Sequence, residues 1–96
     1  MPFTPDAALS LARDIAHLLK GKYGATRVLL FGSRAKERFT PESDIDIYFE
    51  GVSKDLALRA VGECIRRFGE ESIDYRPDCF CTPYFKKRVL AEGKLL

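Results

Sequence analysis

The sequence lacks an apolar run long enough to cross a lipid bilayer. Its longest apolar stretches, such as residues 28–31, fall far short of the roughly 20 residues that a membrane-spanning helix needs. The opening residues Met-Pro-Phe-Thr-Pro-Asp also lack the basic and apolar regions of a secretory signal. We therefore expect a protein of the cytoplasm that does not contact a membrane.

An excess of charge of one sign is also missing. Sixteen basic and fourteen acidic side chains give a formal net charge of +2. Binding along a nucleic-acid backbone depends on many cationic contacts to phosphates, so this balance does not support nucleic acid as a partner. With 46% hydrophobic and 31% charged residues, the composition is typical of a folded domain rather than a disordered segment.

The cysteines are few and odd in number. Cys64, Cys79 and Cys81 cannot all pair within one chain, so we expect reduced thiols. Cys79 and Cys81 would need further Cys or His ligands to bind zinc, and neither Cys64 nor His17 lies at a useful spacing. The sequence therefore predicts incidental thiols, together with a surface histidine rather than a catalytic one.

No repeat, low-complexity segment or linker divides the 96 residues, which predicts a single domain (residues 1–96) with one modest core. Caps and apolar periodicity predict helices from Pro5 to Gly21 or Gly24, from Ser53 to Gly69, and from Thr82 to about Gly93. Strands are predicted at residues 27–31, 44–50 and 72–76, with a short helix after the first strand and a loop at 77–81. This order predicts an α/β (α+β) fold in which helices pack on a small mixed sheet.

The predicted strand at residues 44–50 has one polar face. Alternation places Asp44, Asp46 and Tyr48 on that face and apolar residues on the other. Two ionised carboxylates so close together repel each other unless a cation lies between them, and Mg²⁺ prefers oxygen ligands of this kind. The pair therefore indicates a site for metal and nucleotide, while Tyr48 is expected to pack or to line the pocket.

The first strand ends directly on Gly32 and Ser33. A glycine there permits close approach of the backbone to a ligand, and the amides that follow can donate to phosphate oxygens at the start of a short helix. Arg34 fits two interpretations equally, as a phosphate contact or as part of a solvated helix face. Gly-Ser and Asp-x-Asp are each weak signals alone, and their combination on neighbouring strands is what favours a triphosphate site.

These motifs carry a family resemblance. Residues 31–35 (FGSRA) and 43–47 (SDIDI), with ten residues between Gly-Ser and Asp-x-Asp, resemble the minimal nucleotidyltransferases, relatives of the DNA polymerase β palm. The resemblance covers nearly the whole chain. It implies that Gly32 and Ser33 hold the triphosphate of ATP and that Asp44 and Asp46 hold Mg²⁺, with two ions in the complete site.

The resemblance also implies a third carboxylate on a later strand. Asp74 lies within a short run of β-forming residues and is the preferred match, as metal ligand and as the group that activates the attacking hydroxyl. Asp78 remains the alternative, although a carboxylate in a proline-flanked loop is more often a turn residue.

The nature of the acceptor is implied by the same resemblance. Members of the family are commonly antitoxins whose partner is a helical nuclease toxin of the HEPN class, and those with intact motifs transfer AMP from ATP to a tyrosine of that toxin. A chain this short has little room for an acceptor domain of its own, which favours such a partner. The alternatives are a binding module that neutralises its partner by occlusion through the apolar C-terminal part, and transfer to a small molecule.

Overall fold

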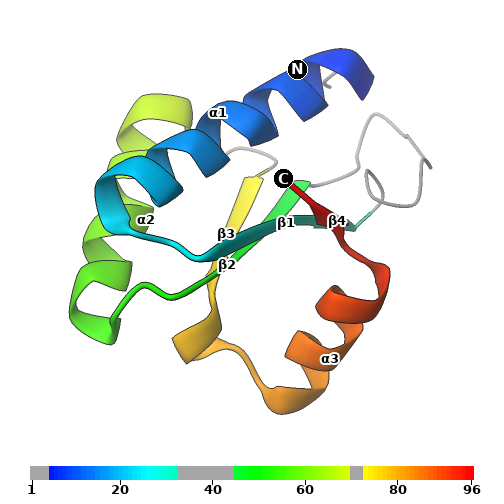
Figure 1. Cartoon of the computed structure of the whole chain (residues 1–96). Helices are drawn as coiled ribbons and strands as arrows, with labels where there is room; N and C mark the ends of the chain where they lie inside the picture. The colour runs from blue at the N-terminus through cyan, green and yellow to red at the C-terminus, as the bar shows by residue number, and fades with distance from the viewer. Residues whose placement is uncertain (1–4, 33–44, 70–72) are drawn as a thin grey trace.

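The computed structural model describes residues 5–32, 45–69 and 73–96, which form one small three-layer arrangement (Figure 1). The helices are α1 (Pro5–Tyr23), α2 (Lys54–Phe68) and α3 (Pro83–Glu92), with a 3₁₀ turn at Asp78–Phe80. The strands are β1 (Arg27–Gly32), β2 (Ile45–Glu50), β3 (Ile73–Pro77) and β4 (Lys94–Leu95). The short helix predicted after the first strand lies outside the described residues.

The four strands form one mixed sheet in the order β3-β2-β1-β4. β1 pairs antiparallel with both β2 and β4, whereas β2 and β3 are parallel. The predicted small mixed sheet with helices packed on it is therefore confirmed. β4 was not predicted, because a strand of two residues has no periodicity to reveal it; only its pairing with Leu29 and Leu30 of β1 defines it.

Helices α1 and α2 cover one face of the sheet and form the main core (Figure 1). Their buried residues meet the apolar residues that alternate along the strands. The fully buried side chains of this core include Ile15, Leu19, Val28, Ile45, Ile47, Phe49 and Cys64. Burial of this surface, at about 25 cal/mol per Å², is the main force that holds the sheet and two helices together.

The ends of the helices follow the predicted capping signals. The Ser53 side chain accepts a hydrogen bond from the Leu56 amide at the start of α2, and the Thr82 side chain accepts one from the Phe85 amide at the start of α3. α1 ends at Tyr23, directly before Gly24, whose φ of +73° lies in the left-handed region that glycine tolerates best.

Helix α3 packs on the opposite face of the sheet and makes a second, smaller core. Leu29, Phe31 and Tyr48 from the strands are buried with Val89 of α3, and Phe85 packs against them. This layer covers only part of the face, since it leaves the Asp74 side chain on β3 half-exposed.

Within the described residues, no helix is long and apolar enough to span a membrane.

Candidate active site

Two carboxylates meet where β2 and β3 begin. Asp46 and Asp74 are partners in the parallel pairing of these strands, so their Cα atoms are about 4.8 Å apart. Strand alternation directs both side chains to the face that carries α3, because their neighbours Ile45 and Ile73 are buried in the opposite core. The Asp46 side chain is 19% exposed and that of Asp74 is 53% exposed.

Arg76 lies beside both carboxylates. Its Nε is 3.5 Å from Oδ1 of Asp46, and its Nη2 is 3.9 Å from Oδ2 of Asp74. The guanidinium carbon also lies 5.0 Å from the ring centroid of Phe85, so α3 supports the arginine from the side of the smaller core. Arg76 therefore supplies the positive charge that partly balances the two acids.

The charge on Asp46 remains costly despite this arginine. Burial raises the pKa of Asp46 to about 6, the Arg76 guanidinium opposes that rise, and the nearby Asp74 carboxylate adds to it. A carboxylate with a raised pKa beside a second acid gains most from an added cation. The physical chemistry of the pair therefore favours a hard divalent ion at this place.

Of the remaining predicted metal and nucleotide residues, the structure describes Gly32. Gly32 is the last residue of β1 and pairs with Ile45, one residue before Asp46. Ser33, Arg34 and Asp44 lie outside the described residues. The end of β1 thus lies next to the start of β2. The strand that leads into the Gly-Ser motif and the strand that follows from the Asp-x-Asp motif are therefore neighbours.

The alternative third carboxylate, Asp78, lies elsewhere. It opens the 3₁₀ turn after Pro77, and Pro77 pairs with Phe49 near the far end of β2. Asp78 comes four positions after Asp74, about 13 Å further in the strand direction. The structure therefore brings Asp74, and not Asp78, to Asp46.

Tyr48 shares the face of Asp46 but belongs to the packing. The side chain is fully buried, and its hydroxyl donates a 2.6 Å hydrogen bond to Oε2 of Glu50. Burial and this bond raise the pKa of Tyr48 above its ordinary value, and the Arg27 guanidinium lies 2.7 Å from Oε1 of Glu50. Tyr48 thus anchors the strand rather than exchanging protons.

The donor set fits Mg²⁺ better than a soft metal. Asp46 and Asp74 offer carboxylate oxygens, and Asp44, which lies outside the described residues, is the third predicted ligand. Among residues 5–32, 45–69 and 73–96, no group of three or more His, Cys, Asp or Glu side chains is clustered for a metal. Asp46 and Asp74 are thus the two described members of the three predicted metal ligands.

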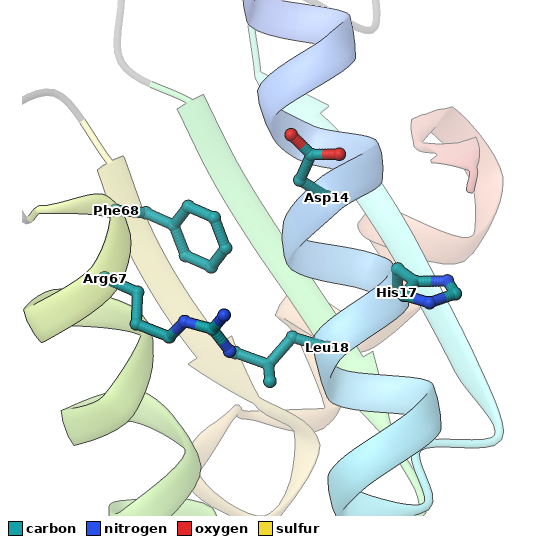
Figure 2. Close-up of a pocket in the computed structure, with 5 residues that line it drawn as sticks. All are labelled: Asp14, His17, Leu18, Arg67 and Phe68. Carbon is teal, nitrogen blue, oxygen red and sulfur yellow. The ribbon is translucent and has the colours of Figure 1, made fainter.

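Cys64 and His17 lie on the opposite face of the sheet from the carboxylates, whereas Cys81 packs against the smaller core. Cys64 is buried in the main core, and the Cys81 thiol donates to the Pro77 carbonyl oxygen. His17 is exposed and lines a hollow of about 340 Å³ between α1 and α2, on the opposite face of the sheet from Asp46. Figure 2 shows Phe68 extending toward α1, whereas His17 points away from α2.

Two site residues were missed by the sequence analysis, Arg76 and Phe85. A signal for Arg76 was present, because residues two apart on a strand share a face and Asp74 was already a candidate. No sequence signal could reveal Phe85, since its contact with Arg76 depends on how α3 folds back over the sheet.

Comparison with known proteins identifies a family for the chain. The family model described as polymerase beta, nucleotidyltransferase matches residues 13–96. A protein from Sulfolobus solfataricus, described with its crystal structure as a candidate nucleotidyltransferase, is 28% identical to this chain with a TM-score of 0.61. The match covers 95% of this chain and 80% of that one. No curated protein matches the chain.

Proposed function

This chain belongs to the polymerase β nucleotidyltransferase family, and we propose that it transfers AMP from ATP to a tyrosine hydroxyl of a partner protein. The observation that carries the proposal is the pairing of Asp46 with Asp74 on a partly open face, next to the strand end that leads into Gly32-Ser33. Nucleotidyl transfer follows from the family, whereas ATP, the tyrosine and the partner are the proposed part.

The two carboxylates have different surroundings and hence different proposed roles. Asp74 is the more exposed of the two, so it is the group that an incoming hydroxyl can reach. It would accept the tyrosine proton while the tyrosine oxygen bonds to the α-phosphorus and the bond to pyrophosphate breaks. Asp46, more buried and held by Arg76, would serve as a fixed ligand rather than a proton carrier.

Mg²⁺ is the proposed cofactor, held by Asp44, Asp46 and Asp74. When bound, it would supply positive charge for the phosphate oxygens and for the departing pyrophosphate. Arg76 contacts two of these three carboxylates, so its positive charge would lie beside the bound ion. Its position over Phe85 keeps the guanidinium at the edge of the site.

A HEPN-type toxin is the proposed partner, and the surface of α3 and β4 supports contact with a protein. The C-terminal apolar residues divide into two groups. Val89 is buried, and Phe85 and Leu96 pack against the cores, whereas Tyr84, Leu90 and Leu95 are 72%, 43% and 64% exposed. Such exposed apolar side chains suit contact with a partner that brings its own acceptor tyrosine.

The test is transfer of label from ATP in the presence of Mg²⁺ to the product of the neighbouring gene. Wild-type protein should add one or more AMP groups, seen as a mass shift on a tyrosine. Asp46→Asn should abolish the shift, whereas Asp55→Asn, an exposed acid of α2, should not. Equal labelling by wild type and Asp46→Asn would refute the proposed chemistry.

A second candidate function is neutralisation by occlusion, favoured by the same exposed residues Tyr84, Leu90 and Leu95. In that case, binding alone silences the partner. Cells that carry the toxin distinguish the two functions, because an occluding protein still protects them as Asp46→Asn, whereas a transferase does not. Leu90→Ser paired with Leu95→Ser should remove protection in both cases.

A further inference from the structure

A second arginine lies on the same face of the sheet as the carboxylates. The guanidinium carbon of Arg88, on α3, is 5.7 Å from the ring centroid of Phe31. Phe31 is the pairing partner of Asp46 across β1 and β2, and it directly precedes Gly32. Arg88 therefore lies at the strand end where the proposed nucleotide binds, although no sequence motif includes it.

Arg88 and Arg76 stand at the two ends of one row of stacked groups. Arg76 lies over Phe85, Phe85 meets Phe31 edge to face at 5.7 Å, and Arg88 lies over Phe31. Cation–π contact fixes the position of each guanidinium without neutralising its charge. The row thus places two positive charges along the partly open face, separated by two rings.

The two arginines differ in what their charges already contact. Arg76 contacts both Asp46 and Asp74. Arg88 contacts Glu92 at 3.5 Å, one turn further along the same helix, and its side chain is 44% exposed. An exposed ion pair of this spacing is weak, so a more highly charged anion can displace it.

We propose that Arg88 binds the terminal phosphates of the donor nucleotide and so positions the α-phosphate at the Asp46–Asp74 pair. This role rests on the proposed function of the site. The planar guanidinium can donate two parallel hydrogen bonds to phosphate oxygens, and a triphosphate carries the highest negative charge density among the proposed reactants. The side of the site near Gly32 thus holds the leaving pyrophosphate, and the side near Asp74 stays open to the acceptor.

The test measures how ATP and AMP displace a fluorescent ATP analogue from the full chain in the presence of Mg²⁺. Arg88→Gln keeps a polar side chain at this position but removes the charge. We expect this substitution to weaken ATP binding about tenfold and AMP binding less than twofold, because AMP lacks the terminal phosphates. Arg88→Lys should restore part of the ATP affinity, and Arg59→Gln, an exposed site on α2, should match wild type.

The outcomes separate this role from the proposed function. Unchanged ATP affinity in Arg88→Gln, or an equal loss for ATP and AMP, would overturn the role of Arg88 alone. Wild-type protein that fails to bind ATP would overturn the proposed function, and this role with it. Partial rescue by Arg88→Lys, at an unchanged melting temperature, would exclude a purely structural contribution.

Discussion

At the scale of the residue, one ionised carboxylate of the candidate site lowers the stability of the folded protein. Asp46 is the clearest case, since burial outweighs the nearby Arg76 and raises the pKa of this carboxyl to about 6. A raised pKa means that the folded protein binds this proton more tightly than the unfolded chain does. Stability therefore decreases as the pH rises from the ordinary aspartate pKa, about 4, to about 6.

We predict that Asp46→Asn stabilises the metal-free protein at pH 7 by about 1 to 3 kcal/mol, because the substitution removes this charge cost. The gain should shrink as the pH falls below 6 and vanish below 4, where wild type is protonated in both states. Urea unfolding in EDTA at several pH values measures it, with the exposed Asp14→Asn as control. A constant difference from pH 3 to pH 8 would contradict the prediction.

Asp74 and Asp78 are the two candidates for the third carboxylate, and single substitutions can compare them. Removal of a general base typically costs 10²- to 10⁴-fold in rate. We predict a loss of that order in the transfer rate for Asp74→Asn and less than a twofold change for Asp78→Asn, since only Asp74 adjoins Asp46. Single-turnover labelling of the partner measures both rates. A larger loss for Asp78→Asn would identify that residue as the functional carboxylate.

Among the elements, α3 is the least self-sufficient. It has ten residues, fewer than an isolated helix needs to be stable in water, so its packing and its cap maintain it. Phe85 and Val89 anchor it to the sheet, Phe85 supports Arg76, and Arg88 is one of its own side chains. Local unfolding of α3 should therefore disrupt the candidate active site before it disrupts the main core.

We predict that Thr82→Ala lowers the free energy of unfolding by about 1 kcal/mol, because the Phe85 amide loses the side chain that accepts its hydrogen bond at 3.1 Å. Amide hydrogen exchange should accelerate within α3 and remain unchanged in α1. Ser53→Ala, which removes the equivalent cap of α2, serves as the matched control and should act on α2 instead. Uniform acceleration along the chain would show that α3 does not open separately.

At the scale of the whole molecule, an ion-pair cluster joins α1 and α2, the two helices of the main core. Glu63 of α2 contacts Lys22 of α1 at 2.8 Å, accepts a hydrogen bond from Tyr23, and lies 3.4 Å from Arg67. The hydrogen bond from Lys22, followed by that from Tyr23, lowers the pKa of Glu63 to about 2. Its contribution to stability is therefore complete above the ordinary glutamate pKa and is lost as the pH falls through about 2.

We predict that Glu63→Gln lowers the melting temperature at pH 7 and that the difference from wild type disappears near pH 2. Glu92→Gln, which alters an exposed ion pair within α3, should lower the melting temperature less. Thermal unfolding followed by circular dichroism between pH 2 and pH 8 measures both variants. Equal melting temperatures for wild type and Glu63→Gln at pH 7 would show that the cluster does not stabilise the helix pair.

The sequence by itself determined the local features of this protein. Proline and hydroxyl caps set the starts of α2 and α3, glycines set their ends, and the alternation of residues 45–50 set which side chains share a face. Each depends on neighbours within a few residues, and such neighbours are readable from the chain. The Gly-Ser and Asp-x-Asp motifs, ten residues apart, carry a resemblance to the family that the family model then matched.

Only the tertiary structure decided which distant residues meet. The parallel register of β2 and β3 places Asp74 beside Asp46 and leaves Asp78 at the far end, and spacing along the chain does not encode a register. The return of α3 over the sheet places Phe85 under Arg76 and Arg88 over Phe31. These contacts depend on how two layers pack on opposite faces of one sheet, which is a property of the whole fold and not of any segment.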